Sequence, residues 1–214
     1  MEDDPRRSKS QDSMGMPVPT FDENLDSANV MNDEERKPIS FKKLTGEEVH
    51  RKMVEDPDRT KLIDARYDYE YEGGRIKTAI NFQTFKDLTK FYSNNTGKDI
   101  DIIFYCEFSQ HRSVEIIQNF RNYDRLQNLY PKHTFPNLFL LIGGFKKAFY
   151  ETNHICEGTY VPMRDPRYLT ILPSRDDLFK QEFVLQKTSI MRSKSLKNQR
   201  ESKVSHSYDY LHNM

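Results

Sequence analysis

The sequence contains few cysteines and no long apolar run, and both absences narrow the class of protein. Only two cysteines, Cys106 and Cys156, occur in 214 residues. They are too few for the disulfide framework of a small secreted domain, so a reducing compartment is expected. No apolar run exceeds Leu138–Ile142 in length, which is far short of the roughly 20 residues that cross a bilayer. The acidic start lacks the apolar segment of a signal peptide. We therefore expect a protein of the nucleus and cytoplasm with no membrane partner.

Other absences concern ligands. The six histidines are scattered without the spacing of metal ligands, and the sequence has no glycine-rich nucleotide-binding loop and no internal repeat. We therefore expect no metal site and no cofactor. The net charge is zero, and no nucleic-acid partner is expected.

The balanced charge conceals an asymmetry between the two ends of the chain. Residues 1–38 have a net charge of −5 and show no sustained apolar period, which predicts a disordered acidic leader. Residues 186–214 have a net charge of +4, which predicts a basic, disordered tail; a tail that contacts an acidic partner surface is the alternative. Between them, residues 39–185 are long enough for one domain with a sizeable core.

Helical and strand patterns alternate along this domain. Thr45–Glu48 has the pattern of a capping box and predicts the start of a helix. Tyr67–Tyr71 predicts one helical turn. Strands alternating with helices at this spacing indicate a parallel sheet covered on both faces. The expected strands are Lys61–Asp64, Ala79–Asn81, Ile100–Tyr105 and Leu138–Leu141, and the further helices are Thr84–Tyr92, Arg112–Tyr130 and Phe145–Tyr150.

A cysteine and an arginine separated by five residues lie between a strand and a helix. Cys106 follows the apolar run Ile102–Tyr105, and Arg112 opens the next helical pattern. Backbone N–H groups that curl inward at a helix N-terminus form a site for a tetrahedral oxyanion. They would also lower the pKa of the Cys106 thiol and make it a nucleophile. The planar fork of Arg112 can bind two phosphoryl oxygens. The pattern predicts catalysis by Cys106 and Arg112 through a cysteinyl-phosphate, with a phosphate-binding loop of Glu107, Phe108, Ser109, Gln110, His111 and Arg112.

A structural interpretation of the same residues is also available. Cysteine is among the most buried residue types, and an arginine six residues later occurs by chance. The position between a strand and a helix favours the catalytic interpretation, because ligands of open α/β sheets bind beyond the carboxyl ends of the strands.

Four ordered motifs around this loop resemble those of the M-phase inducer phosphatases. Asp64–Asn81 resembles the family's Asp-Cys-Arg-Tyr-x-Tyr-Glu-Tyr-x-Gly-Gly-His-Ile segment, and Cys106–Ser109 resembles the opening of its active-site loop. Leu141–Phe145 and Tyr160–Met163 match later landmarks of the family. The resemblance extends from the region of Ile39 to that of Phe183.

The resemblance implies a rhodanese-like, three-layer α/β fold, with a central, mostly parallel five-stranded sheet and helices on both faces. It also implies a dual-specificity protein tyrosine/threonine phosphatase that removes inhibitory phosphates from a cyclin-dependent kinase, bound to its cyclin, and so promotes mitotic entry. The protein is expected to be a monomer. Arg121 and Arg125 are four residues apart on one helix face and match positions at which the family contacts its kinase substrate.

The sequence departs from the family at four positions. His111 replaces the Glu before the loop arginine, Ser113 replaces the Gly after it, and Glu115 replaces a basic residue. Ser113 could donate a hydrogen bond to the Cys106 sulfur and speed hydrolysis of the phosphoenzyme, or simply satisfy N–H groups early in the helix. Ala65 replaces a second cysteine, which in the resembled family resolves an oxidised active-site thiol.

The departures leave the general acid open. Glu107 and His111 are the candidates within the loop, although a phosphothreonine monoanion could carry its own proton. Asp64 and Arg66 are expected to form a structural pair beneath the site, and Glu70 is expected to support the fold.

Two other classes of function remain compatible with the pattern. The first is an arsenate reductase or sulfurtransferase of the rhodanese fold. Sulfur transfer typically uses a loop one residue shorter, whereas arsenate has almost the shape of phosphate. The second is a non-catalytic module that docks kinases, and the presence of both Cys106 and Arg112 argues against it.

Overall fold

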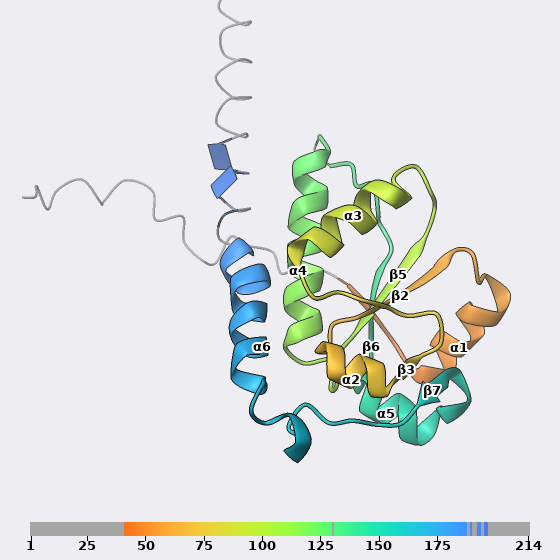
Figure 1. Ribbon diagram of the computed structural model, residues 1–214. Helices are drawn as coiled ribbons and strands as arrows, with labels where there is room; N and C mark the ends of the chain where they lie inside the picture. The colour runs from red at the N-terminus through yellow and green to blue at the C-terminus, as the bar shows by residue number, and fades with distance from the viewer. Residues whose placement is uncertain (1–40, 130, 188, 190–191, 194, 197–214) are drawn as a thin grey trace, which may run out of the picture. The chain divides into compact units, whose positions relative to one another are not determined.

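Five parallel strands form the central sheet of the computed structural model, which describes residues 41–129, 131–187, 189, 192–193 and 195–196 (Figure 1). Each pair of neighbouring strands in this sheet is parallel. The predicted α/β class and the five-stranded parallel sheet are therefore confirmed. In their order across the sheet the strands are β1 (Lys42–Leu44), β6 (Leu138–Leu141), β5 (Asp101–Tyr105), β2 (Thr60–Asp64) and β4 (Ile80–Asn81).

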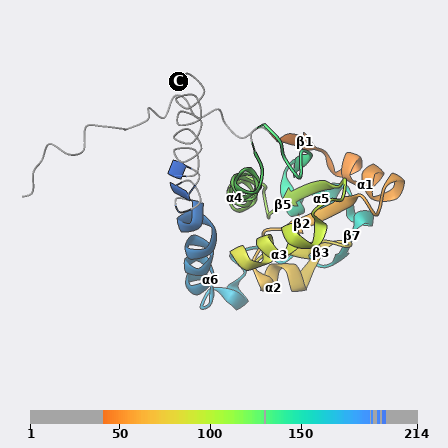
Figure 2. The same ribbon diagram turned by 90° about the horizontal axis from the view of Figure 1, so that it is seen from above.

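Helices cover both faces of the sheet, so the predicted three layers are present (Figures 1 and 2). Successive strand side chains point to opposite faces. The helices are α1 (Gly46–Glu55), α3 (Phe85–Asn95), α4 (Arg112–Gln127) and α5 (Gly144–Glu151). In β5, Ile102 and Phe104 join the core beneath α3 and α4, whereas Ile103 and Tyr105 join the core beneath α1 and α5. Among the described residues, no helix is both long enough and apolar enough to span a bilayer.

A short helix and a two-stranded ribbon connect these layers near one edge. α2 (Asp68–Gly73) leads directly into β3 (Gly74–Ile76), which pairs in antiparallel register with β7 (Cys156–Gly158). The short helix η2 (Asn153–Ile155) joins α5 to β7. Tyr67–Tyr71, predicted as one helical turn, thus lies at the start of α2.

The C-terminal helix was not predicted from the sequence. α6 (Leu172–Phe179) continues into η4 (Lys180–Leu185) and runs beside α4 (Figures 1 and 2). Its sequence has no clear apolar stripe, and long-range contacts hold it in place. Phe183 is fully buried in the core beneath α3 and α4, its carbonyl accepts a hydrogen bond from Asn119 Nδ2 at 2.7 Å, and Glu182 accepts one from the Phe85 N–H at 2.8 Å.

Two further differences separate the prediction from the structure. Strand β1 was not predicted, because three residues at a sheet edge carry almost no periodic signal. The helix predicted to reach Tyr130 ends at Gln127. Asn128 takes an extended conformation there, and its side-chain amide donates to the Asp124 carbonyl at 2.7 Å and to Thr134 Oγ1 at 3.0 Å. These contacts end the helix before Pro131 can do so.

The predicted termini fall largely outside the described residues. The leader at 1–38 lies wholly outside them. Of the tail at 186–214, residues 186–187, 189, 192–193 and 195–196 are described, and all are helical.

The start of α5 approaches the loop after β5 at backbone contact distance. Gly144 has a left-handed φ of 65°, and a Cβ placed on it would lie 2.3 Å from the Cys106 carbonyl oxygen and 2.5 Å from that of Glu107. Such distances are not possible for a real side chain, so the loop and α5 require glycine at position 144.

Gly144→Ala should therefore lower the free energy of unfolding by about 3 kcal/mol or more. The left-handed conformation costs an L-residue roughly 1–2 kcal/mol, and displacement of packed groups typically adds about 1–3 kcal/mol. Gly97 is the matched control, because it also has a left-handed φ of 85°, but no atom of the described residues lies within 4 Å of its hypothetical Cβ. Urea unfolding of both alanine variants measures the difference; equal losses would show that the close approach at Gly144 is not tight.

Candidate active site

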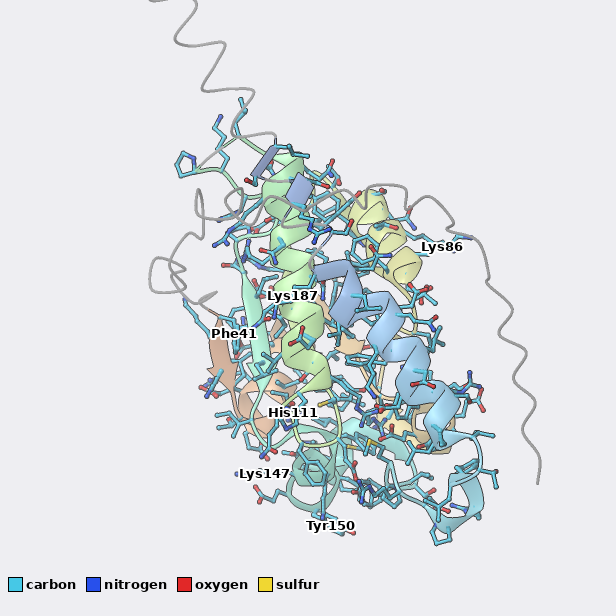
Figure 3. All side chains as sticks on the ribbon, turned by 90° about the vertical axis from the view of Figure 1, so that its left-hand side faces the viewer. Phe41, Lys86, His111, Lys147, Tyr150 and Lys187 are labelled. Atoms are coloured by element: carbon cyan, nitrogen blue, oxygen red, sulfur yellow. The ribbon has the colours of Figure 1, made fainter. Side chains whose placement is uncertain are left out.

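The loop between β5 and α4 lies at the carboxyl edge of the sheet, where ligands of such folds bind. Cys106 is 4% exposed and Arg112 is also buried, whereas Phe108, Gln110 and His111 are exposed. Figure 3 shows His111 at the end of α4 at which this loop enters the helix. Ser109 has a positive φ of 56°, which tightens the loop between the cysteine and the arginine.

Hydrogen bonds from α5 turn the loop amides in one direction. The Phe145 N–H donates to the Cys106 carbonyl at 2.9 Å, and the Lys146 N–H donates to the Glu107 carbonyl at 3.1 Å. In a trans peptide the N–H points opposite to the C=O, so the N–H groups of Glu107 and Phe108 face away from α5. The N-cap residue of α4, His111, makes no capping hydrogen bond with its side chain. These features together make an anion site of the kind that the sequence predicted.

A hydrogen-bond donor lies next to the Cys106 thiol. Ser113 Oγ lies 3.4 Å from Cys106 Sγ and donates to it, and Ser113 is fully buried in the first turn of α4. Of the two roles that the sequence left open for Ser113, the contact with the Cys106 sulfur is present in the structure. A donor at this position stabilises negative charge on the sulfur.

Arg112 is paired with Glu70, which sequence reasoning treated only as a fold residue. Glu70 is fully buried, and its carboxylate accepts from Arg112 Nη1 at 2.5 Å and from Nη2 at 3.2 Å. Burial raises the pKa of Glu70, and the charge of Arg112 opposes that shift. For Arg112, burial acts to lower the pKa, but the hydrogen bonds and charge of Glu70 outweigh it and raise the pKa. The guanidinium is therefore always charged.

The pairing leaves one side of the guanidinium available. A guanidinium has five N–H donors, and a carboxylate that binds both Nη atoms occupies one edge. Within the described part of the chain, Glu70 accepts every hydrogen bond that the Arg112 side chain donates. The Tyr67 ring also stacks at 4.5 Å from the Arg112 guanidinium carbon. Glu70 and Tyr67 thus orient Arg112, and its Nε edge can bind an oxyanion.

The C-terminal helix supports this arrangement. The Tyr67 hydroxyl donates to Asp176 at 3.0 Å, and Asp68 forms an ion pair with Arg175. Asp176 and Arg175 both lie on α6, so this helix fixes the Tyr67 ring that stacks on Arg112. No local sequence pattern predicts these contacts, because they join residues more than 100 positions apart.

Glu107 is a poor general acid in this structure. Its carboxylate accepts hydrogen bonds from the Tyr160 hydroxyl and from the Met163 N–H, the latter at 3.4 Å. The side chain therefore fixes the Tyr160–Met163 segment, one of the landmarks of the resembled family. Of the two predicted acid candidates, His111 is exposed, and no hydrogen bond joins its imidazole to another of the described residues.

The prediction that Arg121 contributes to a docking surface is wrong. Arg121 is only 4% exposed, and its guanidinium donates to Asp124 at 2.9 Å and to the carbonyls of Phe135 and Pro136 at 2.8 and 3.1 Å. This arginine connects α4 to the segment before β6. Arg125, four residues later, is half-buried and stays a candidate for docking.

Asp64 and Arg66 form the structural pair that the sequence predicted. The Arg66 guanidinium donates to both Asp64 oxygens and stacks 3.9 Å from the centre of the Phe145 ring. Both side chains are fully buried. The pair holds the end of β2 against the start of α5.

Ala65 lies on the same side of the sheet as Cys106, whereas Cys156 lies on the opposite side. Ala65 shares a core cluster with Cys106, and its N–H donates to the carbonyl of Tyr105 at 2.8 Å. Cys156 belongs to the other cluster, and burial raises the pKa of its thiol to about 11. The central sheet thus separates the two cysteines.

We predict that peroxide oxidises Cys106 without forming a Cys106–Cys156 disulfide, because the two thiols cannot approach to bonding distance. Ala65→Cys should instead form a disulfide with Cys106, since position 65 adjoins it in the same core. Mass spectrometry of peroxide-treated protein measures both outcomes. Ala148→Cys is the control, because Ala148 is buried on the opposite face. A Cys106–Cys156 disulfide in the wild type would contradict the prediction.

Comparisons with known proteins agree with this geometry. The rhodanese-like domain family matches residues 45–151, which is half of the chain. An M-phase inducer phosphatase from Dictyostelium discoideum is 38% identical over 149 residues, covering 66% of this chain and 14% of that protein. M-phase inducer phosphatase 1 from Mus musculus is 41% identical over 108 residues, covering 48% of this chain and 21% of that protein. The resemblance to M-phase inducer phosphatases is confirmed, although the chain spans at most about a fifth of these relatives' length.

A solved structure shows a weaker likeness. An As-Sb reductase from Leishmania major has 17% sequence identity and a TM-score of 0.47, with 59% of this chain and 91% of that chain covered. This likeness does not bear on function. The family match and the curated relatives are sufficient for the assignment: the chain belongs to the rhodanese-like domain family.

Proposed function

We propose that the chain is a cysteine-dependent protein phosphatase of the M-phase inducer type. The observation that carries the proposal is the loop itself: Cys106 and Arg112 stand at its two ends, and α5 turns its amides toward one side. The names of the relatives support the same reaction class. The five intervening residues make a loop that suits a tetrahedral oxyanion.

In the proposed reaction the Cys106 thiolate attacks the phosphorus of a phosphate ester. A sulfur–phosphorus bond forms, the ester phosphorus–oxygen bond breaks, and the leaving alkoxide or phenoxide takes up a proton. The loop N–H groups and the Nε edge of Arg112 stabilise the equatorial oxygens as charge develops. The phosphate monoanion or the exposed His111 supplies the proton, since Glu107 is engaged with Tyr160.

Water then hydrolyses the cysteinyl-phosphate and regenerates the thiolate. Ser113 assists in this step, because its hydroxyl donates to Cys106 Sγ and so stabilises the sulfur as it leaves phosphorus. A hydrogen bond to the charged form lowers the energy of a leaving thiolate.

The proposed substrate is a cyclin-dependent kinase, with its cyclin, phosphorylated on tyrosine and threonine. The words "M-phase inducer" in the names of the relatives support this choice. The consequence would be promotion of mitotic entry, and the proposed location is the nucleus and cytoplasm. Phe108 is 45% exposed on the loop, and Lys146 lies 5.3 Å from the centre of its ring. We assign contact with the kinase to this loop rim and to Arg125 on α4.

Cys106→Ser should lower kcat by at least about a thousandfold, because a serine hydroxyl is a far weaker nucleophile than a thiolate. Arg112→Lys should lower it by roughly a hundredfold, because an ammonium cannot reproduce the planar fork. Phosphate release from p-nitrophenyl phosphate and from the phosphorylated kinase measures both. Cys156→Ser, on the far face of the sheet, should retain wild-type activity. Vigorous turnover by Cys106→Ser would refute the mechanism.

Glu70→Gln should lower kcat by roughly ten- to a hundredfold, because a misplaced catalytic group costs up to about a hundredfold in rate. The amide keeps the size of the carboxylate but has one acceptor oxygen, so it cannot bind both Nη atoms of Arg112. A loss in kcat and in vanadate affinity, with KM for the aryl phosphate nearly constant, indicates a positioning role.

Glu115→Gln is the matched control for this experiment. Glu115 is a carboxylate on α4, close in sequence to Arg112, but it pairs with Lys187 at 3.4 Å and is partly exposed. The kcat of Glu115→Gln should therefore equal that of the wild type. A folded Glu70→Gln protein with unchanged kcat and vanadate affinity would show that Arg112 does not need Glu70.

A further inference from the structure

Three potential metal ligands meet on the side of the molecule formed by α1 and η2. Glu47 and His50 lie three residues apart on α1, and His154 lies in η2. One donor atom from each lies within 4.8 Å of the other two. His154 Nε2 and His50 Nδ1 are only 3.0 Å apart. The sequence led us to expect no metal site, because the two histidines are 104 positions apart in the chain; the fold brings them together.

Contacts outside the two imidazole rings fix the distance between α1 and η2. A Cβ on Gly46 would lie 2.2 Å from Thr152 Oγ1, so glycine at the start of α1 allows the segment before η2 to approach closely. Thr152 is buried, and its N–H donates to the Ala148 carbonyl at 2.8 Å. Lys77 Nζ donates to the His154 carbonyl at 2.8 Å. His154 is thereby held opposite His50 by contacts that do not involve either imidazole.

The donor set suits zinc. Zinc binds imidazole nitrogen at about 2.0–2.1 Å in a tetrahedral site, which separates neighbouring ligand atoms by about 3.3 Å. The 3.0 Å between the two ring nitrogens is close to that separation. Each neutral imidazole can place its proton on its other nitrogen, so both facing nitrogens can offer a lone pair. Glu47 and His154 are exposed and His50 is half-buried, which leaves the site open to solvent.

We propose that Glu47, His50 and His154 form a zinc site with water as the fourth ligand. A bound ion connects α1 to the segment that joins α5 to β7. The first amides of α5 hold the loop carbonyls of Cys106 and Glu107, so the site stabilises the layer on which the loop rests. This proposal does not depend on the proposed phosphatase activity.

Zinc titration of the untagged full chain tests the proposal. All variants carry Cys106→Ser, because a reactive thiolate is itself a zinc ligand. The protein with this single change is called the parent. Isothermal titration calorimetry with zinc chloride should show one site per chain. His50→Ala or His154→Ala should weaken binding at least about tenfold, and Glu47→Gln should weaken it by several-fold, because each removes one of three protein ligands. The thermal midpoint of the parent should rise with zinc concentration.

Two variants serve as controls. Glu151→Gln removes an exposed carboxylate of the same region that pairs with Lys147, and His133→Ala removes a histidine that contacts Asp124. Both should bind zinc as tightly as the parent. In NMR spectra of the parent, zinc should shift the imidazole signals of His50 and His154 and leave those of His111 and His133 unchanged, which identifies the ligands without any substitution.

The titration and NMR results either support the zinc site or overturn it. One site that is lost with His50 or His154 and whose ion perturbs only those two imidazoles supports the proposal. No binding by the parent, or binding that survives the double change His50→Ala and His154→Ala, overturns it.

Discussion

The backbone contact between α5 and the loop after β5 is the constraint on which the candidate site depends. Gly144 allows the first amides of α5 to reach the carbonyls of Cys106 and Glu107. Those hydrogen bonds direct the intervening amides to the opposite side, where the N-terminus of α4 adds its own N–H groups. Any side chain at position 144 would push the loop away. Gly144 therefore serves two purposes: it allows α5 to pack against the loop, and it allows the hydrogen bonds that orient the amides of the anion site.

Three buried charge pairs then hold the segments around this contact in place. Arg66 with Asp64, Arg112 with Glu70 and Arg121 with Asp124 are each buried or nearly so. Removal of one partner from such a pair typically costs about 3–5 kcal/mol, because the remaining charge is left without compensation. The three pairs differ in what they position: the first supports the start of α5, the second orients the loop arginine, and the third holds the chain before β6.

The central sheet separates the two cysteines as well as the two core clusters. Cys106 and Ala65 lie in one cluster, and Cys156 lies in the other. The histidines of the proposed zinc site belong to α1 and η2, on the Cys156 side. A reactive thiol and a metal site can therefore be present in one domain without sharing ligands.

The sequence alone determined the strands β2, β5 and β6, the capped helices and the strand–loop–helix context of Cys106 and Arg112. These features are local: a capping box spans four residues, strand periodicity spans five, and the loop spans seven. Only the tertiary structure decided which long-range partners these residues have. It paired Arg112 with Glu70, buried Arg121, engaged Glu107 with Tyr160 and brought His50 to His154. Side chains such as Arg and Glu look the same in sequence whether they face solvent or a partner, because burial is set by segments far away in the chain. The C-terminal helix was missed for the same reason, since its stability comes from contacts with α2, α3 and α4 and not from its own pattern.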